Sequence, residues 1–424
     1  MSAAPPDPLA PFLATLRKSR LVDPAELDRL AARANADAAR AFADQLIRSG
    51  HLTHYQADKL LRGLWQGLVL GPYSVLAPIG RGGMGTVVYL ARDRRMSEEL
   101  GDVELVALKL LPDRKAARDP RILARFRREM DLGRQVEHRN VVRTLGSGEI
   151  DAVHFLAMEF VPGKTLRQVV AENGPLDVGA AARVFADVAA GLAHVHARGL
   201  VHRDVKPANV MLRPDGRAVL LDLGLAIRTG EELPDDLTIV GGPGYAVGTM
   251  DYLAPEQARD ASAVGPPADL YALGGSLVFA LTGSVPFPAA TTKEKVLRHR
   301  DDPPPPLPGV PPAFERMVHK LLAKTPAGRF ASAAEMRDRL LPFATAMPVR
   351  PAVDVLALAD VPGRDSGLWD STPGEEIPVL EEVEVEEIVI ATEIIDEEPP
   401  ARSRRGCAAV FVLAGVAVAV GRWL

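Results

Sequence analysis

Several features that would direct the interpretation elsewhere are scarce in this chain of 424 residues. It has one cysteine, Cys407, which excludes internal disulfides and fits a reducing compartment. Its net charge of -5 provides no basic excess, so the composition gives no sign of nucleic-acid binding. No apolar run follows the start, so no secretory signal is predicted. With 47% hydrophobic and 25% charged residues, the chain can still bury a large core.

One short stretch, residues 202–211 (HRDVKPANVM), has the groups that phosphoryl transfer requires. Asp204 could accept a hydroxyl proton, and Lys206 could neutralise charge on a transferring phosphoryl group. Asn209 could hold a magnesium ion together with Asp222, which ends a later apolar strand. A single match of this kind arises easily by chance, so the interpretation depends on the residues before and after it.

A glycine-rich segment precedes this stretch. Residues 79–89 contain the pattern G-x-G-x-x-G-x-V, with Gly80, Gly82, Gly85 and Val87 at its fixed positions. Glycines suit a phosphate-binding loop because a side chain would keep the backbone amides from closing over the phosphates. Glycine-rich turns are common, so this motif alone is weak evidence for a nucleotide.

A lysine and a glutamate between these two motifs form a candidate ion pair. Lys109 ends the apolar run 106–108, and Glu129 shares the apolar side of the next predicted helix with Phe126. Asp119 and Pro120 predict the start of that helix. A strand-end lysine can also extend its ammonium group to solvent, and most helical glutamates are solvated. The apolar neighbours favour the ion pair.

Further motifs follow the central stretch in a fixed order: residues 219–224 (VLLDLG), 248–256 (GTMDYLAPE), 268–274 (ADLYALG) and 327–330 (AGRF). Seven short motifs thus appear in the order and spacing of one family. Over about residues 72–343 the chain resembles the protein kinases, specifically the bacterial eukaryote-like (Hanks-type) Ser/Thr kinases. The resemblance implies an α+β, two-lobed fold with an antiparallel sheet in the N-terminal lobe and a mainly helical C-terminal lobe.

The resemblance also implies roles for individual residues, with ATP and Mg2+ as cofactors. The catalytic set comprises the base, a phosphate-contacting lysine and the ion pair: Asp204, Lys206, Lys109 and Glu129. Asn209 and Asp222 are the implied metal ligands. The implied ATP-binding set is Ile79, Gly80, Gly82, Gly85, Val87, Ala107, Lys109, Met158, Glu159 and Val161. Met158 can also be a core residue. Asp269 and the pair Glu256–Arg329 resemble structural supports of the fold.

The substrate class follows from the same resemblance. Lys206, two places after Asp204, and Thr249 before the Ala-Pro-Glu segment are typical of kinases that act on serine and threonine of proteins. Leu223 replaces the family's phenylalanine after Asp222, and its size should preserve packing against the helix that carries Glu129. The alternative is a nucleotide-binding scaffold without turnover, although the catalytic residues are intact.

Regulation is predicted at the loop 225–248. Thr229 and Thr238 are candidate phosphorylation sites, because Arg203 beside Asp204 would offer a cation to a phosphate on this loop. Autophosphorylation of Thr238 is therefore a hypothesis. A solvated threonine without a regulatory role is an equal alternative.

Helices are predicted over residues 1–71, before the kinase-like region. Pro24 follows a capping aspartate, Gly50 marks a stop, and Thr53 caps a helix that reaches Leu61. Similar extensions precede the glycine loop in some bacterial kinases. A docking site for a partner and a helical bundle resting on the small lobe are both compatible with this pattern.

The C-terminal part changes composition twice. Residues 344–405 are rich in proline and acid, which predicts a disordered linker, although an acidic partner-binding segment is the alternative. Residues 406–424 follow a basic cluster, and their apolar run of sixteen residues reaches about 24 Å as a helix. This is slightly short of a hydrocarbon core of roughly 30 Å. We expect a tail anchor with the kinase on the cytoplasmic side of the membrane, in preference to a buried or peripheral helix.

Overall fold

The computed structural model describes residues 9–32, 39–81, 86–95, 105–112, 120–223, 225–229, 249–260 and 264–346. Several sequence-based expectations fall outside these ranges: Gly82, Gly85, Asp119, Thr238, the linker from residue 347 onward and the apolar tail. The side chain of Thr249 also lies outside the description.

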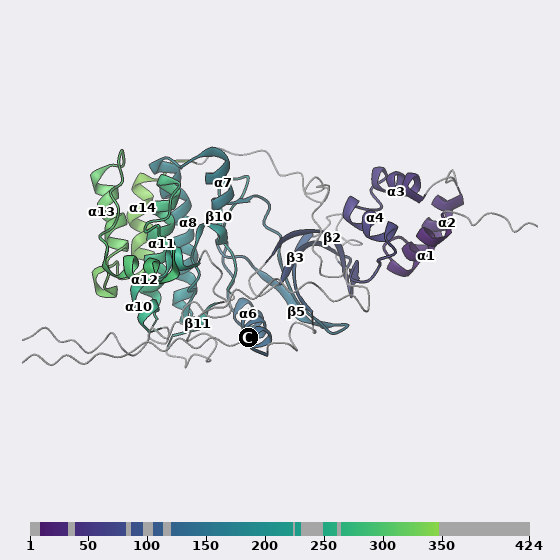
Figure 1. The fold of residues 1–424 in the computed structure, drawn as a ribbon, viewed down its shortest axis with the longest axis horizontal. Helices are drawn as coiled ribbons and strands as arrows, with labels where there is room; N and C mark the ends of the chain where they lie inside the picture. The colour runs from purple at the N-terminus through teal and green to yellow at the C-terminus, as the bar shows by residue number, and fades with distance from the viewer. Residues whose placement is uncertain are drawn as a thin grey trace, which may run out of the picture. The chain divides into compact units, whose positions relative to one another are not determined.

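Four short helices precede the first sheet, drawn in purple in Figure 1. They are α1 (Ala10–Ser19), α2 (Pro24–Ala32), α3 (Ala39–Arg48) and α4 (His54–Leu61). Their apolar faces meet in one core that includes Phe12, Leu27, Phe42 and Leu60. As the sequence predicted, the Thr53 side chain caps α4.

A six-stranded antiparallel sheet follows, in the order β1-β2-β3-β4-β6-β5. Its strands are β1 (Val69–Leu70), β2 (Tyr73–Arg81), β3 (Val87–Asp93), β4 (Leu105–Pro112), β5 (Thr144–Ile150) and β6 (Val153–Glu159). Helix α6 (Pro120–Gly133) packs beside it, because the buried ring of Phe126 joins Leu111 and Leu156 in one cluster. This sheet and helix form the N-terminal lobe.

The C-terminal lobe is mainly helical. Its elements include α7 (Leu166–Asn173), α8 (Val178–Ala197), α10 (Pro255–Arg259), α11 (Pro266–Thr282), α12 (Thr292–Asp301), α13 (Pro312–Leu321) and α14 (Ala333–Leu340), with short 3-10 turns η3 (Thr249–Tyr252), η5 (Pro326–Gly328) and η6 (Leu341–Phe343). Asp177 caps α8 by accepting from Ala180 N at 2.8 Å, and apolar side chains follow around the whole helix. Consequently α8 and α11 provide much of this lobe's core. Together the sheet-bearing lobe and the helical lobe confirm the two-lobed fold.

Short strands hold the loops between the lobes. The strand β9 (Val210–Leu212) pairs with β10 (Ala218–Leu220) and β7 (Lys164–Thr165), and β8 (Leu200–Val201) pairs with β11 (Ile227–Arg228). The turn η2 (Pro207–Asn209) directly precedes β9. Residues 202–209 and 221–226 are therefore each fixed at both ends by a strand.

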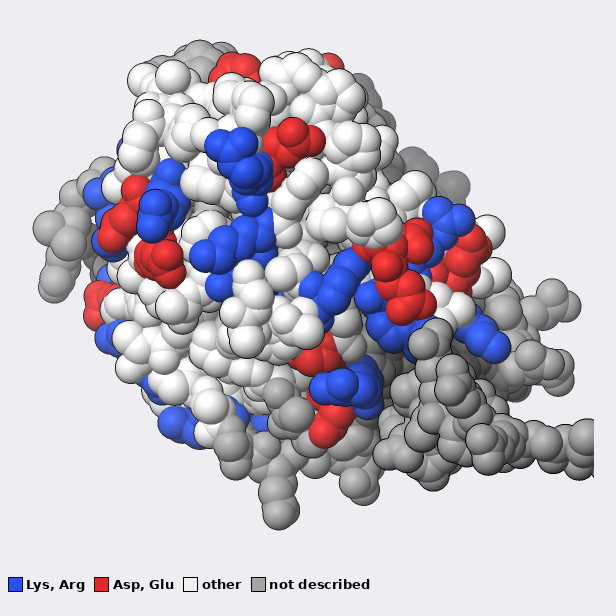
Figure 2. Space-filling view, turned by 90° about the vertical axis from the view of Figure 1, so that its left-hand side faces the viewer, with Lys and Arg blue, Asp and Glu red and all other residues white. Residues whose placement is uncertain are grey.

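Among the described residues, one helix is long and apolar enough to cross a membrane, namely α8. Its side chains are largely buried in the C-terminal lobe, so it serves as a core helix of that lobe. The face that carries α13 has basic side chains beside acidic ones at several places (Figure 2). Helix α12 carries one exposed ion pair of this kind, Arg298–Glu294, at 2.6 Å.

Candidate active site

The loop that carries Asp204 is held from beneath by a buried acid. Asp269 at the start of α11 accepts hydrogen bonds from His202 N at 2.8 Å and Arg203 N at 2.7 Å. Arg203 has a φ of 65°, a left-handed backbone conformation that non-glycine residues rarely adopt. Burial raises the pKa of Asp269, but the hydrogen bond and charge of His196 lower it below its ordinary value. An ionised Asp269 therefore fixes the strained turn before Asp204.

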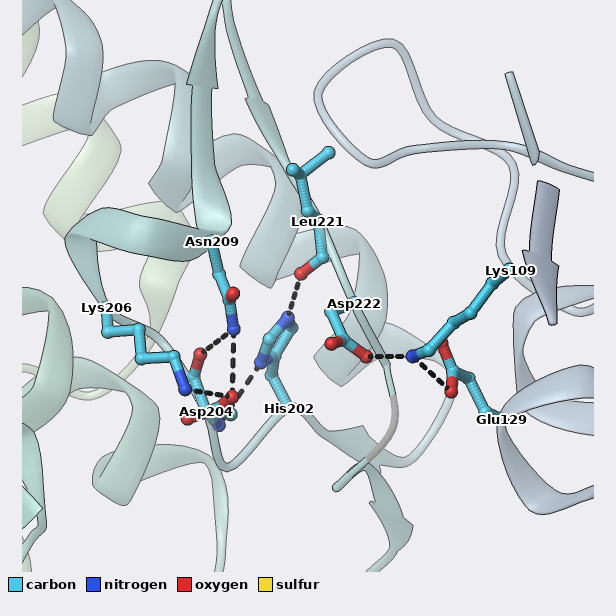
Figure 3. A network of polar contacts seen from close by, with 8 residues as sticks. All are labelled: Lys109, Glu129, His202, Asp204, Lys206, Asn209, Leu221 and Asp222. Atoms are coloured by element: carbon cyan, nitrogen blue, oxygen red, sulfur yellow. Dashed lines mark hydrogen bonds and ion pairs between the residues drawn. The ribbon is translucent and has the colours of Figure 1, made fainter. Parts of the chain in front are cut away.

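Asp204 has one carboxylate oxygen that is paired and one that is unpaired among the described residues. Its Oδ2 contacts Lys206 Nζ at 2.8 Å and accepts from Asn209 Nδ2 at 2.9 Å (Figure 3). Its Oδ1 is buried and makes no hydrogen bond to any residue that the structure describes. Burial raises the pKa of Asp204, and Lys206 opposes that shift. A buried acceptor without a partner is costly, so Oδ1 is a candidate acceptor for a donor that the described residues do not include.

His202 links this loop to the segment that carries Asp222. Its Nδ1 accepts from Asp204 N at 3.3 Å, which leaves Nε2 to donate to Leu221 O at 3.1 Å. Leu221 N in turn donates to Asn209 O at 2.8 Å. Asp222 also has a left-handed backbone, with a φ of 62°. These contacts hold Asn209 beside the segment that carries Asp222, thirteen positions later in the sequence.

The predicted partners Lys109 and Glu129 form a buried ion pair. Lys109 Nζ, from β4, lies 2.7 Å from both carboxylate oxygens of Glu129 on α6, and 3.3 Å from Asp222 Oδ1. Burial lowers the pKa of Lys109, but the carboxylates of Asp222 and Glu129 raise it by more. In Figure 3, Asp222 lies between this pair and the group of Asp204, Lys206 and Asn209. One charged network thus connects groups from both lobes.

Leu223, the departure from the family pattern, is buried beside the same helix. It shares a cluster with Leu132 of α6 and with Val136 and Val195. The leucine thus retains an apolar contact with the helix that carries Glu129, as its size predicted.

The strand register corrects the expectation for Val87. In the β3–β4 pair, Val87 lies opposite Leu110, whereas Val88 lies opposite Lys109. Directly opposed residues of an antiparallel pair share a face, and successive residues alternate between faces. Val87 is accordingly buried with Tyr89 and Leu110 in the cluster on the face away from Lys109. Val88, which the sequence reasoning did not select, is on the same face as Lys109 and Ala107.

The remaining residues predicted to contact the nucleotide lie in strands β2 and β4 and in the segment that joins the lobes. Met158 and Glu159 end β6, and Val161 is buried just beyond it. Met158 packs with Met211 of β9 against the cluster of Val161, so it is also a core residue. The sequence analysis assigned no role to Met211, although its place in a strand two residues after Asn209 could have indicated its packing beside Met158. Ile79 and Gly80 lie in β2, and Ala107 is partly exposed in β4.

The side chains near Asp204 include oxygen donors of the kind that magnesium binds. No group of three or more His, Cys, Asp or Glu side chains that could hold a metal ion occurs in the described ranges. Asn209 and Asp222 nevertheless offer oxygen ligands, and magnesium in kinase sites takes only one or two protein carboxylates together with phosphate oxygens. Asn209 commits its Nδ2 to Asp204, which leaves its Oδ1 as an acceptor. This chemistry fits a magnesium–phosphate complex.

A second buried ion pair stabilises the C-terminal lobe away from these groups. Arg329 NH1 and NH2 contact the two carboxylate oxygens of Glu256 at 2.5 and 2.7 Å. The guanidinium group also stacks over Tyr271, 4.8 Å from the ring centroid. This bidentate pair joins the start of α10 to the turn η5, so it supports the fold.

Comparisons with known proteins agree with this geometry. The model of the protein kinase domain matches residues 73–340. The chain is 34% identical over 272 residues to the serine/threonine-protein kinase PrkC of Bacillus subtilis, covering 63% of this chain and 40% of that protein. It is 36% identical over 279 residues to the serine/threonine-protein kinase pkn3 of Myxococcus xanthus, covering 63% of this chain and 49% of that protein. It is 36% identical over 290 residues to the serine/threonine-protein kinase PknB of Mycobacterium leprae, covering 66% of this chain and 44% of that protein. The chain therefore spans less than half the length of each of these relatives. Since the domain match covers more than half of this chain, the chain belongs to the protein kinase family.

Proposed function

We propose that this chain is an ATP-dependent protein serine/threonine kinase with Asp204 as its catalytic base. The observation that carries this proposal is the unpaired Oδ1 of Asp204, which is buried without a partner among the described residues. Lys206 and Asn209 hold the other oxygen of the same carboxylate, so Oδ1 is the atom available to a substrate hydroxyl. The raised pKa of Asp204 makes the carboxylate a better proton acceptor than an exposed aspartate.

The other groups serve binding and charge neutralisation. Bound ATP would supply the phosphoryl group, and magnesium held by Asn209 and Asp222 would neutralise its charge. Lys109 would bind phosphate oxygens, and its contacts with Glu129 and with the metal-ligand candidate Asp222 support this role. Lys206 would stabilise charge on the phosphoryl group during transfer, and its contact with Asp204 supports this role.

The adenine ring would bind beneath the sheet, on the face that carries Lys109. Val88 and Ala107 would cover the ring, and Met158 and Met211 would contact it from the back and below. Backbone groups of Glu159 and Val161 would hydrogen-bond its edge. Gly80, with Gly82 and Gly85, would cover the phosphates.

Serine and threonine of proteins are the proposed acceptors. Lys206 two places after the base supports this assignment, and the relatives reported above are named serine/threonine-protein kinases. The test is transfer of labelled phosphate from ATP to three peptides that differ only in a serine, threonine or tyrosine acceptor. Wild type should label the first two, and Asp204→Asn should lower the rate by about a thousandfold. Equal labelling by both proteins would contradict the role of Asp204.

Membrane attachment is a further part of the proposal. The apolar residues 406–421 after the basic cluster of residues 402–405 support a tail anchor with the kinase in the cytoplasm. A buried or peripheral helix remains the competing interpretation. Fractionation of cells that express the full chain tests it, because an anchored protein needs detergent for release. Complete recovery in the aqueous fraction would remove the anchor.

A further inference from the structure

Helix α4 begins with a capping box whose two side chains also reach the sheet. Thr53 N donates to Gln56 Oε1 at 2.9 Å, and Gln56 N donates to Thr53 Oγ1 at 3.2 Å. Beyond the helix, Thr53 Oγ1 donates to Leu76 O at 2.6 Å, and Gln56 Nε2 donates to Val75 O at 2.7 Å. Both side chains are almost completely buried. The same two residues therefore begin the helix and hold strand β2.

The carbonyls that they hold lie on the outer edge of β2. The short strand β1 pairs only with Tyr73 and Ser74, and Leu68 O accepts from Val75 N at 2.9 Å. Beyond these contacts, the β2–β3 register shifts between Val75 and Ala77. A buried carbonyl at such a shift needs a donor, because an unsatisfied backbone group costs about 1–3 kcal/mol. Gln56 and Thr53 supply the donors that a neighbouring strand would otherwise provide.

Tyr55 extends the contact from β2 to β3. Its ring lies 6.3 Å from that of Tyr89, which is completely buried in the middle of β3. Tyr55 packs against two apolar clusters. One is the core of the four N-terminal helices, and the other is the cluster on the sheet that includes Val87 and Tyr89. Through Tyr55, the N-terminal helices thus make apolar contacts with the sheet that contains the two strands flanking the glycine loop.

A third contact lies at the ends of β2 and β3 that are remote from the glycine loop. Arg94, just after β3, donates to Arg20 O at 3.2 Å and to Gly71 O at 3.3 Å. It therefore joins the end of α1 to the residues that precede β2. The N-terminal helices contact β2 and β3 at several separate points.

We propose that the N-terminal helices position strands β2 and β3, which would cover the bound nucleotide, through Gln56 and Thr53. These two side chains act as positioning residues for ATP. This inference rests on the kinase function proposed above. Strand β2 runs from the held carbonyls of Val75 and Leu76 to Gly80 and Arg81, where the glycine loop begins. Strand β3 resumes after the loop at Val87. A change in how α4 holds β2 shifts the end of this strand at Gly80, on the sheet that carries Lys109, while the groups on the C-terminal lobe remain in place.

Helix α7 provides a matched control within the same chain. It begins with an equivalent capping box, in which Thr165 N donates to Gln168 Oε1 at 2.8 Å and Gln168 N donates to Thr165 Oγ1 at 3.2 Å. Gln168 is exposed, and its hydrogen bonds to described residues all go to Thr165 at the start of its own helix. Replacing either glutamine by glutamate keeps the capping acceptor. Only Gln56→Glu removes the donor to the strand and places a carboxylate against a carbonyl.

The experiment measures phosphate transfer and magnesium–ADP binding by the full chain carrying Gln56→Glu or Gln168→Glu. Gln56→Glu should raise the KM for ATP and the Kd for magnesium–ADP by about five- to tenfold, the factor for one or two net hydrogen bonds. Its kcat should change less than twofold. Gln168→Glu should leave all three constants within twofold of wild type. A merely structural role for Gln56 would lower kcat through loss of active protein and leave KM and Kd unchanged, and that result would overturn the proposal.

A second pair of variants keeps the proposal falsifiable if Gln56→Glu fails to fold. Thr53→Ser retains the hydroxyl that bonds to Leu76 O and should preserve KM and Kd. Thr53→Val removes it and should raise both by about three- to fivefold. Equal constants for these two variants would overturn the proposal. Absence of transfer by wild type together with a Kd change in the variants would refute the kinase function and leave the positioning role supported.

Discussion

The two lobes hold their functional groups in different ways. In the C-terminal lobe, Asp204 follows a turn whose backbone amides both donate to the buried carboxylate of Asp269. In the N-terminal lobe, Lys109 and Glu129 come from a strand and a separate helix, and their side chains meet in one buried ion pair. The first arrangement is fixed by the backbone, and the second depends on where α6 lies against the sheet.

This difference suggests that phosphoryl transfer depends on the C-terminal lobe, whereas control of activity depends on the N-terminal lobe. The base and its neighbours need little reorganisation, because His202 also ties their loop to Leu221. Lys109 would lose the partner that orients it if α6 moved, since Glu129 lies on that helix. We therefore expect changes in the C-terminal lobe to lower stability and activity together. In the N-terminal lobe, we expect that paired changes can restore stability without restoring activity.

The largest effect should come from the ion pair. Lys109→Met should lower kcat/KM by about a thousandfold, because it removes a phosphate-binding cation and the orienting partner of Glu129. It should also cost about 3–5 kcal/mol of unfolding free energy by leaving Glu129 unpaired. Adding Glu129→Leu should restore most of that stability and none of the activity. Denaturant unfolding and kinetics on both proteins measure this, and recovery of activity in the double variant would refute the separation.

A smaller loss of activity, inseparable from stability, is expected at Asp269. Asp269→Ala leaves His202 N and Arg203 N without their acceptor, at a cost of roughly 3 kcal/mol. The released turn should misplace Asp204 and lower kcat by about a hundredfold. Unfolding curves and phosphate-transfer rates on one preparation provide the measurement. A variant with wild-type kcat in its folded fraction would show that the turn positions Asp204 without this acid.

The smallest effect distinguishes two neighbouring valines. Val88→Ala should raise the KM for ATP about three- to tenfold, because it removes apolar contact on the face of Lys109. Val87→Ala should leave KM unchanged and lower the unfolding free energy by about 1–2 kcal/mol, since Val87 is buried in the opposite core. Steady-state kinetics and thermal unfolding of both variants test the assignment. The reverse pattern would return Val87 to the nucleotide site.

Most of the fold and the grouping of the charged residues could be predicted from the sequence, because the motifs occur in a fixed order. The face of Val87 could not be predicted in this way. A motif counts residues, whereas the side of a strand depends on its register, and β2 pairs with β3 through two shifts. The capping role of Thr53 was likewise readable from local spacing. Its bond to Leu76 O joins residues 23 positions apart and depends on tertiary packing.

The central claim is that Asp204 performs the transfer step while other residues bind the nucleotide. Measuring the magnesium–ADP dissociation constant and the phosphate-transfer rate of wild type and Asp204→Asn on the same preparations tests it most directly. We predict dissociation constants within twofold of each other and a transfer rate about a thousandfold lower in the variant. Undiminished transfer by Asp204→Asn, with binding intact, would contradict the account.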